Sequence, residues 1–188
     1  MKKILSALII LTSFNTFAQK PCEIDREFTD SLGSYTSLKQ QLVFERSFAG
    51  NSTRIYFTLS TNNGILSLET ETLQQSNDFI KANCFDKNSK LFLQLNNGKI
   101  ITLLHIDQEN CGTMIRDDKG YDNRVITGEF MFMKDSFEQL KSSPISMMRI
   151  KYLTDTEDYV LKKEFTSELN NEIYQPETYF INTIKCIE

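Results

Sequence analysis

Alternating apolar residues on both sides of an Asn-Gly turn mark the centre of this chain, at residues 91–106. Asn and Gly tolerate the positive φ that tight hairpin turns require, so the turn is expected at residues 96–98. With Gly98 in the left-handed conformation, Leu93 faces Ile101, and five apolar side chains share one face of the hairpin. Burial favours this register because a slip of one residue would turn those side chains to solvent. We therefore predict a hairpin at the centre of a sheet, with a packing role and no evident chemistry.

The same period of two recurs along much of the remaining chain and predicts further strands. The segments are residues 37–48, 54–60, 65–72, 124–133, 145–153 and 159–165. No long helical pattern separates them, so parallel strand–helix–strand units are not expected. We predict a mainly β fold of six to eight antiparallel strands, arranged as a β-sandwich or as one curled sheet.

Two short helices complete the predicted fold. Ser136 and Gln139 have the spacing of a capping box, and Pro144 prevents continuation, which predicts a helix near residues 136–142. Near the C-terminus, a proline at a first helical position and apolar residues at helical spacing predict a second helix, near residues 176–187.

The first eighteen residues have the features of a secretory signal peptide. Lys2 and Lys3 precede a short apolar run, and a cleavage site after Ala18 has a small residue at position −1 and a tolerated one, Thr16, at position −3. A buried N-terminal helix and a lipid anchor on Cys22 are the rival interpretations, but no small-residue lipobox precedes that cysteine. We expect residues 19–188 to form a single β-rich domain that is periplasmic or secreted.

Composition narrows the classes of partner. Removal of residues 1–18 leaves 170 residues and, because two lysines leave with them, changes the net charge from −4 to −6. This acidic balance argues against nucleic acid and against anionic membrane surfaces as ligands. No later segment is long and apolar enough to predict a transmembrane helix. The expected partner is a protein, a glycan or an envelope component, and no sequence motif calls for a cofactor.

Four cysteines remain after cleavage, and an exported chain with an even number favours two disulfides, for which three pairings exist. The numbers of Cys84 and Cys111 sum to 195, one more than the sum of 194 that describes facing residues in the central hairpin. One bulge would align them, so Cys84–Cys111 is the leading pair, and Cys22 would then bond to Cys186. The alternative is that Cys84 and Cys111 lie in separate loops and never meet. No Cys-x-x-Cys motif supports a redox or zinc site.

His105 is the only histidine, and it lies close enough in sequence to Cys111 to form a thiol–imidazole pair. A single histidine at a strand end is more often structural or solvated than catalytic, because a general base needs partners. The chain contains no Gly-x-Ser-x-Gly, His-Glu-x-x-His or phosphate-loop motif.

The longest unpatterned stretch is acidic and contains Asp117, Asp118 and Asp122. These carboxylates could bind Ca²⁺, but they lack the spacing of an EF-hand loop, and solvated loop charges are the more common outcome. Because long loops carry function more often than cores do, residues 108–123 are the first place to expect a ligand site.

Short strings along the chain resemble a known group of proteins. They are residues 17–19 at the end of the signal, residues 27–29, residues 93–103, residues 137–150 and residues 180–187. In these strings the chain is similar to a loose group of small exported proteins of Bacteroidota. The resemblance implies an exported, β-rich domain. The group has no known activity, so no site residue carries over from it.

Three functions therefore remain open. The first is a non-catalytic binding or envelope-associated module, which fits a full β core, an export signal and the lack of a catalytic constellation. The second is a small hydrolase that uses Cys111 and His105, and a disulfide at Cys111 would remove that pair. The third is a secreted inhibitor or immunity-type protein.

Overall fold

The computed structural model describes residues 21–134 and 136–187. The predicted signal peptide, residues 1–18, lies outside this part of the chain. The described elements, in chain order, are β1 (Ile24–Asp30), β2 (Gly33–Leu38), β3 (Gln41–Phe48), β4 (Asn51–Asn62), β5 (Ile65–Ser76), β6 (Lys90–Leu95), β7 (Ile100–His105), β8 (Thr113–Arg116), β9 (Asp122–Phe132), α1 (Ser136–Ser142), β10 (Ile145–Lys151), β11 (Thr156–Val160), β12 (Phe165–Thr166), β13 (Ile173–Tyr174), the 3₁₀ turn η1 (Pro176–Thr178), α2 (Tyr179–Thr183) and the 3₁₀ turn η2 (Ile184–Cys186).

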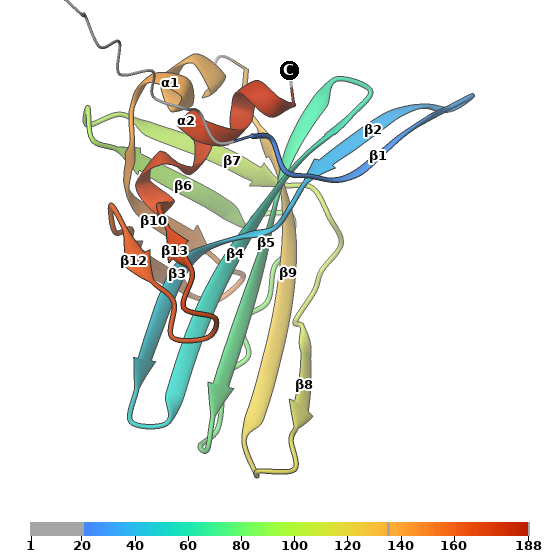
Figure 1. The fold of residues 1–188 in the computed structure, drawn as a ribbon. Helices are drawn as coiled ribbons and strands as arrows, with labels where there is room; N and C mark the ends of the chain where they lie inside the picture. Colours follow the sequence, from blue (N-terminus) through green and yellow to red (C-terminus); the bar gives the residue numbers. More distant parts are fainter. Residues whose placement is uncertain (1–20, 135, 188) are drawn as a thin grey trace, which may run out of the picture.

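Eleven of the described strands form one antiparallel sheet (Figure 1). Its order is β1-β2-β4-β5-β9-β7-β6-β10-β11, and the short hairpin β12–β13 stands apart from it. The long strands β4 and β9 each pair with two different strands along the same edge. Strand β4 pairs with β3 along one half and with β2 along the other, and β9 is shared in the same way by β8 and β7. The sheet therefore changes neighbours along its length, which lets it bend around a core.

The central hairpin adopts the predicted register. Leu93 pairs with Ile101, and Leu91 pairs with Leu103. Gly98 has a φ of 84°, and its N–H donates to the Leu95 carbonyl over 2.9 Å. All five predicted inward side chains are buried, so the hydrophobic pattern had identified the face that packs.

The core lies inside the curl of the sheet, and the helical C-terminus covers one end of it (Figure 1). Phe57 of β4 meets the ring of Tyr179, and Phe132 of β9 meets Phe180 of the same helix. Phe44 of β3 meets Tyr159 of β11 with ring centroids 5.0 Å apart. An edge strand beside β4 therefore meets the last strand of the sheet, and the sheet curls around the core.

The predicted mainly β, antiparallel fold is confirmed, but the predicted number of six to eight strands is too low for the described chain. The strands that the sequence pattern missed include β1 and β8, whose side chains are all exposed. An exposed strand has no buried face, so its apolar and polar residues need not alternate, and the hydrophobic pattern does not reveal it. The predicted strand at residues 37–48 is in fact the end of β2 and the whole of β3, separated by two residues.

The helices agree with their predicted positions. Strand β9 is followed by α1 at Ser136–Ser142, and residues 176–186 are helical as the succession η1, α2 and η2. Leu140 of α1 and Phe180 of α2 are buried in the core. No helix in the described part of the chain is long and apolar enough to cross a membrane.

Two disulfides join the four cysteines in the pairing that the sequence favoured, Cys84–Cys111 and Cys22–Cys186. The first does not require the long strands that an extended hairpin would need. Phe85 and Asn110 form a separate two-way backbone bridge, with N···O distances of 2.8 and 3.1 Å, and the cysteines are the next pair along. Both bonds are typical of a protein that resides in an oxidising compartment.

Truncation of a buried hairpin residue should be far more costly than truncation of its neighbour. Leu93→Ala removes methyl groups from a fully buried site, so we expect a loss of about 2–5 kcal/mol in the free energy of unfolding. Gln94→Ala, on the opposite face of β6, should cost less than about 1 kcal/mol. Denaturant melts of both variants measure the difference, and equal losses would contradict the assigned faces.

The Cys84–Cys111 bond should contribute to stability through the loop that it closes. The two cysteines are 27 residues apart, and in the chain-entropy treatment closure of such a loop stabilises the fold by about 3–4 kcal/mol. We expect Cys84→Ser/Cys111→Ser to lose an amount of this order in denaturant melts. Peptide mapping of the unreduced wild-type protein provides the check on connectivity, and free thiols at both positions would refute the bond.

Candidate functional site

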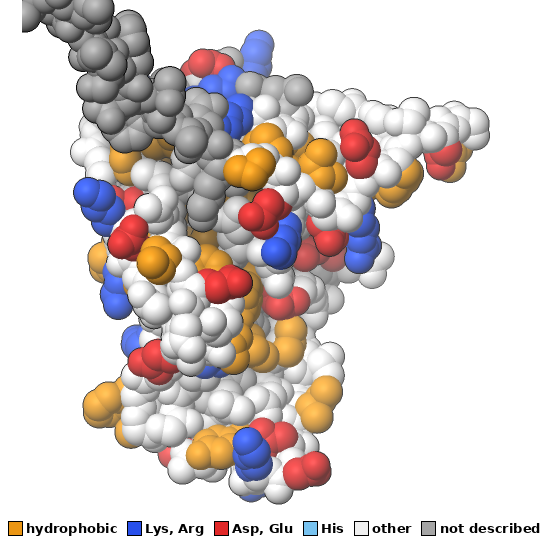
Figure 2. All heavy atoms as spheres, in the orientation of Figure 1, with side chains coloured by type: hydrophobic (Ala, Val, Ile, Leu, Met, Phe, Trp, Pro, Cys, Tyr) orange, Lys and Arg blue, Asp and Glu red, His pale blue; other side chains and the backbone are white. Residues whose placement is uncertain are grey.

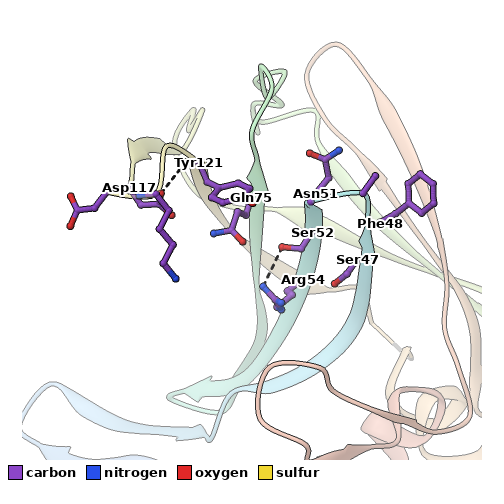
Figure 3. Close-up of a pocket in the computed structure, with 12 residues that line it drawn as sticks. Ser47, Phe48, Asn51, Ser52, Arg54, Gln75, Asp117 and Tyr121 are labelled. Atoms are coloured by element: carbon purple, nitrogen blue, oxygen red, sulfur yellow. Dashed lines mark hydrogen bonds between the residues drawn. The ribbon is translucent and has the colours of Figure 1, made fainter.

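A pocket of about 610 Å³ opens at one end of the curled sheet. It lies between the β3–β4 turn, the C-terminal end of β5 and the β8–β9 turn, which gather at the lower end of the molecule in Figure 1. Small-molecule sites commonly have volumes of about 300–1,000 Å³, so the pocket is large enough for a ligand. Figure 3 shows Asp117 and Tyr121 on one side of the pocket, Ser47 and Phe48 on the other, and Gln75, Ser52 and Arg54 between them.

The β3–β4 turn shapes one wall. Ala49 and Gly50 both have positive φ, 49° and 80°, between the last paired residues Phe48 and Asn51. Two consecutive positive values are the mark of a type I′ hairpin turn, whose twist matches that of the flanking strands. Gly50 faces Tyr121 of the opposite wall, whose Cε1 and hydroxyl oxygen lie 4.0 Å from where a Cβ at Gly50 would stand.

The floor is made by side chains that share the outer face of the sheet, the face turned away from the core. Ser52 pairs with both Ser47 and Gln75, and Arg54 lies two residues further along β4. Because successive side chains of a strand alternate between faces, residues spaced by two project together. The alternate residues of β4, Ile55 and Phe57, are buried in the core. The pocket floor is thus the reverse side of the core strands.

A buried ion pair anchors the floor. The Nε of Arg54 donates to Oε1 of Glu45 over 2.7 Å, with only 13% and 5% of the two side chains exposed. A second guanidinium N–H reaches Ser52 Oγ at 3.3 Å (Figure 3). Burial alone would raise the pKa of Glu45, but hydrogen bonds from Arg54, Glu168 and Ser167 outweigh it and lower that pKa. The guanidinium is therefore held rigidly, with N–H groups left for a ligand.

Asp117 organises the opposite wall. Its carboxylate accepts backbone N–H bonds from Lys119 and Tyr121, at 3.0 and 2.9 Å, and a side-chain bond from Asn123 at 3.1 Å. The bonds from Tyr121 and Asn123 lower the pKa of Asp117. Asn123 in turn accepts a bond from the Gln75 amide at 3.0 Å, which connects the wall to the floor. The turn and the floor are thus one hydrogen-bonded unit.

The rim combines both charge signs with aromatic and amide groups. Asp118 and Lys119 are exposed on the β8–β9 turn, and Tyr121 is half-buried beside them. Asn51 is oriented by a 2.5 Å hydrogen bond from Ser76 Oγ. Figure 2 shows basic, acidic and hydrophobic side chains close together at this end of the molecule. No single sign of charge dominates the pocket.

The structure divides the predicted acidic set. Asp117 and Asp118 line the pocket, whereas Asp122 pairs with Arg116 at 3.4 Å. Asp117 already accepts three hydrogen bonds, from Lys119, Tyr121 and Asn123, and the described residues contain no group of three or more His, Cys, Asp or Glu side chains that could hold a metal ion.

The predicted Cys111/His105 pair is not a nucleophile–base pair in this structure. Cys111 is bonded to Cys84, so its sulfur has no thiolate to attack with. His105 is buried, stacks on Phe85 and contacts Phe130, with its Nδ1 3.0 Å from the Asp86 carbonyl oxygen. These contacts make it a packing residue of the core, away from the pocket.

Residues 108–123, the stretch favoured for ligand binding, contribute the second wall through residues 117–121, although the stretch also contains β8 and half of a disulfide. The floor residues Ser47, Ser52, Arg54 and Gln75 were not predicted. Each is a single polar residue on the strand face turned away from the core, and nothing in the linear pattern distinguishes it from other polar residues on that face. Only the pairing of strands brings these side chains together.

No protein-family model matches this chain, and neither a curated protein nor a solved structure matches it significantly.

The lowered pKa of Glu45 predicts a dependence of stability on pH. A carboxyl whose pKa is depressed by folding stabilises the native state above its unfolded pKa of about 4.3, and that contribution disappears as the pH falls through the folded pKa. The wild-type free energy of unfolding should therefore decrease below about pH 4, and more steeply than that of Glu45→Gln.

At neutral pH, Glu45→Gln should lose about 1–3 kcal/mol because the buried guanidinium of Arg54 loses its charged partner. Glu168→Gln, whose exposed side chain lies close by, is the control and should change little. Urea melts between pH 3 and 7 measure both effects, and parallel pH profiles for wild type and Glu45→Gln would contradict the proposed linkage.

Proposed function

We propose that this chain is an exported, non-catalytic binding module that holds a neutral saccharide in the pocket at the open end of its sheet. The observation that carries the proposal is the set of planar polar side chains that line the pocket and are fixed by bonds to one another. Export rests on the predicted signal peptide and is supported by the two disulfides. The resemblance to exported proteins of Bacteroidota is compatible with this proposal.

The chemistry of the lining favours a polyhydroxylated ligand. Arg54, Gln75 and Asn51 offer N–H donors, Asp118 offers acceptors, and serine hydroxyls can do either. A sugar hydroxyl both donates and accepts, so it matches such a mixed set. Tyr121 adds an apolar ring face with a polar tip, which can lie against the C–H face of a sugar ring.

The balance of charge favours a neutral ligand over an ionic one. Arg54 is neutralised by Glu45, and Lys119 on the rim is accompanied by Asp117 and Asp118. An anion would meet two carboxylates, and a cation would meet two basic side chains. A neutral ligand is repelled by neither set of charges and can use all the hydrogen-bonding groups.

The protonation and hydrogen bonding of Asp117 and Glu45 favour binding without catalysis. Hydrolysis of a glycosidic bond needs one carboxyl that carries a proton at working pH and a second one that is ionised. The pKa of Asp117 is lowered by its own turn and that of Glu45 by its hydrogen bonds, so both stay ionised near neutrality. Each is also committed to structural hydrogen bonds.

The test is a glycan array probed with the protein that starts at Gln19, followed by calorimetric titration with a soluble neutral oligosaccharide that scores on the array. Gln75→Ala and Tyr121→Ala should each weaken binding by about tenfold or more, since a lost pair of hydrogen bonds or a lost ring contact is worth 1–2 kcal/mol. Gln108→Ala, an exposed glutamine outside the pocket, is the matched control and should bind like the wild type. Absence of any neutral ligand, or equal binding by all variants, would contradict the proposal.

A further inference from the structure

An apolar patch lies on the outer face of the sheet, away from the pocket. We define the outer patch as Ile65, Leu104, Ile106 and Met131, whose side chains are 37–61% exposed. Leu104 pairs directly with Met131, and the N–H of Ile106 continues the ladder to the Glu129 carbonyl. Contiguous apolar surface on a soluble protein commonly marks a contact with another molecule.

A pair of acidic residues borders one side of the outer patch. Glu69 of β5 lies directly opposite Glu129 of β9, one pair along from Ser67 and Met131. Burial and the charges of Glu71 and Glu129 raise the pKa of Glu69, and only Arg26 opposes this effect. Like charges directly opposite each other in a sheet destabilise it, so the isolated chain bears a local cost here.

A pair of basic residues borders the other side. Lys90 of β6 lies opposite Leu104 on one edge and opposite Lys151 of β10 on the other. No ion pair engages either lysine within the described chain. This is a second like-charge pair, of opposite sign, and strand β7 lies between the two. Neighbouring strands are about 4.8 Å apart, and Glu129 is two residues along β9 from the position in line with Lys90, so the two residues lie roughly 12 Å apart.

From this pattern we infer that a second copy of this chain docks on the outer patch, face to face, about a two-fold axis. If this axis runs parallel to the strands, near β7, it places the acidic pair of each copy over the basic pair of the other, with the apolar side chains between them. The same contact occurs twice, as two-fold symmetry requires, and it neutralises both like-charge pairs at once. The order β5-β9-β7-β6-β10 makes this surface continuous (Figure 1).

The pattern favours a second copy over an unrelated partner because the patch is complementary to itself. An acidic side, an apolar centre and a basic side, in that order, are matched by their own two-fold image. Only four apolar side chains form the centre of the contact, so the dimer should be one of modest affinity, with a dissociation constant on the order of 1–100 μM.

Sedimentation equilibrium of the protein that starts at Gln19 tests the inference. The wild type should be a reversible dimer whose dissociation constant rises with NaCl concentration, because the contact includes exposed charge pairs. Leu104→Ser/Met131→Ser should raise that constant by about tenfold or more. A wild-type protein that remains monomeric at millimolar concentration would overturn the inference.

Exchanging the charges on the two sides of the outer patch tests whether this patch is the dimer interface. Glu69→Lys/Glu129→Lys makes both sides of the patch basic, and Lys90→Glu/Lys151→Glu makes both sides acidic. Each variant alone should be monomeric, because like charges now face each other, and a 1:1 mixture of the two should form a heterodimer. The heterodimer also proves that both variants fold.

Two control variants alter the same number of charges elsewhere on the exposed surface. Glu27→Lys/Glu109→Lys and Lys87→Glu/Lys163→Glu should dimerise as the wild type does. Dimers in both patch variants alone, or no association in their mixture, would overturn the inference. Binding of a saccharide at the pocket is measured separately, so failure of that proposal leaves this one intact.

Discussion

Burial of one face of a single sheet is the constraint on which the rest of this structure depends. Along β4, β5 and β9, alternate side chains such as Phe57, Leu68 and Phe130 are fully buried. Because a one-residue slip would expose all of them, the register of these strands is strongly held. The same register determines which residues share the outer face. The pocket floor and the outer patch are therefore consequences of core packing, although no residue of either belongs to the core.

The curvature of the sheet separates the two outer-face features. At one end of the sheet, β3 and not β2 pairs with β4, and β8 and not β7 pairs with β9. The hairpin turns at this end enclose the pocket. Further along the same strands, β7 and β6 continue the sheet, and its outer face carries exposed apolar side chains. A polar pocket suits a small ligand, and an exposed apolar surface suits contact with another protein. One layer of strands can therefore present two kinds of surface.

The polar residues of the pocket resemble a small buried network more than a solvated surface. Arg54 is tied to Glu45 and Ser52, and Gln75 is tied through Asn123 to Asp117. A site whose groups are already oriented loses less conformational entropy when a ligand binds. The disulfide Cys84–Cys111 stands at the start of the segment that carries the second wall, so it limits how far that wall can move relative to the core.

The sequence by itself determined the elements that have a buried face: the central hairpin with its register, the alternating strands, α1 and the helical C-terminus. It also favoured both disulfides, since the register arithmetic placed Cys84 near Cys111. It could not reveal β1 and β8, because exposed strands need no alternation. Only the tertiary structure decided that Ser47, Arg54, Gln75 and Tyr121 meet, or that Glu69 faces Glu129. Those encounters depend on which strands pair, and pairing is set by the whole core, whereas hydrophobic periodicity reports only on each segment's own burial.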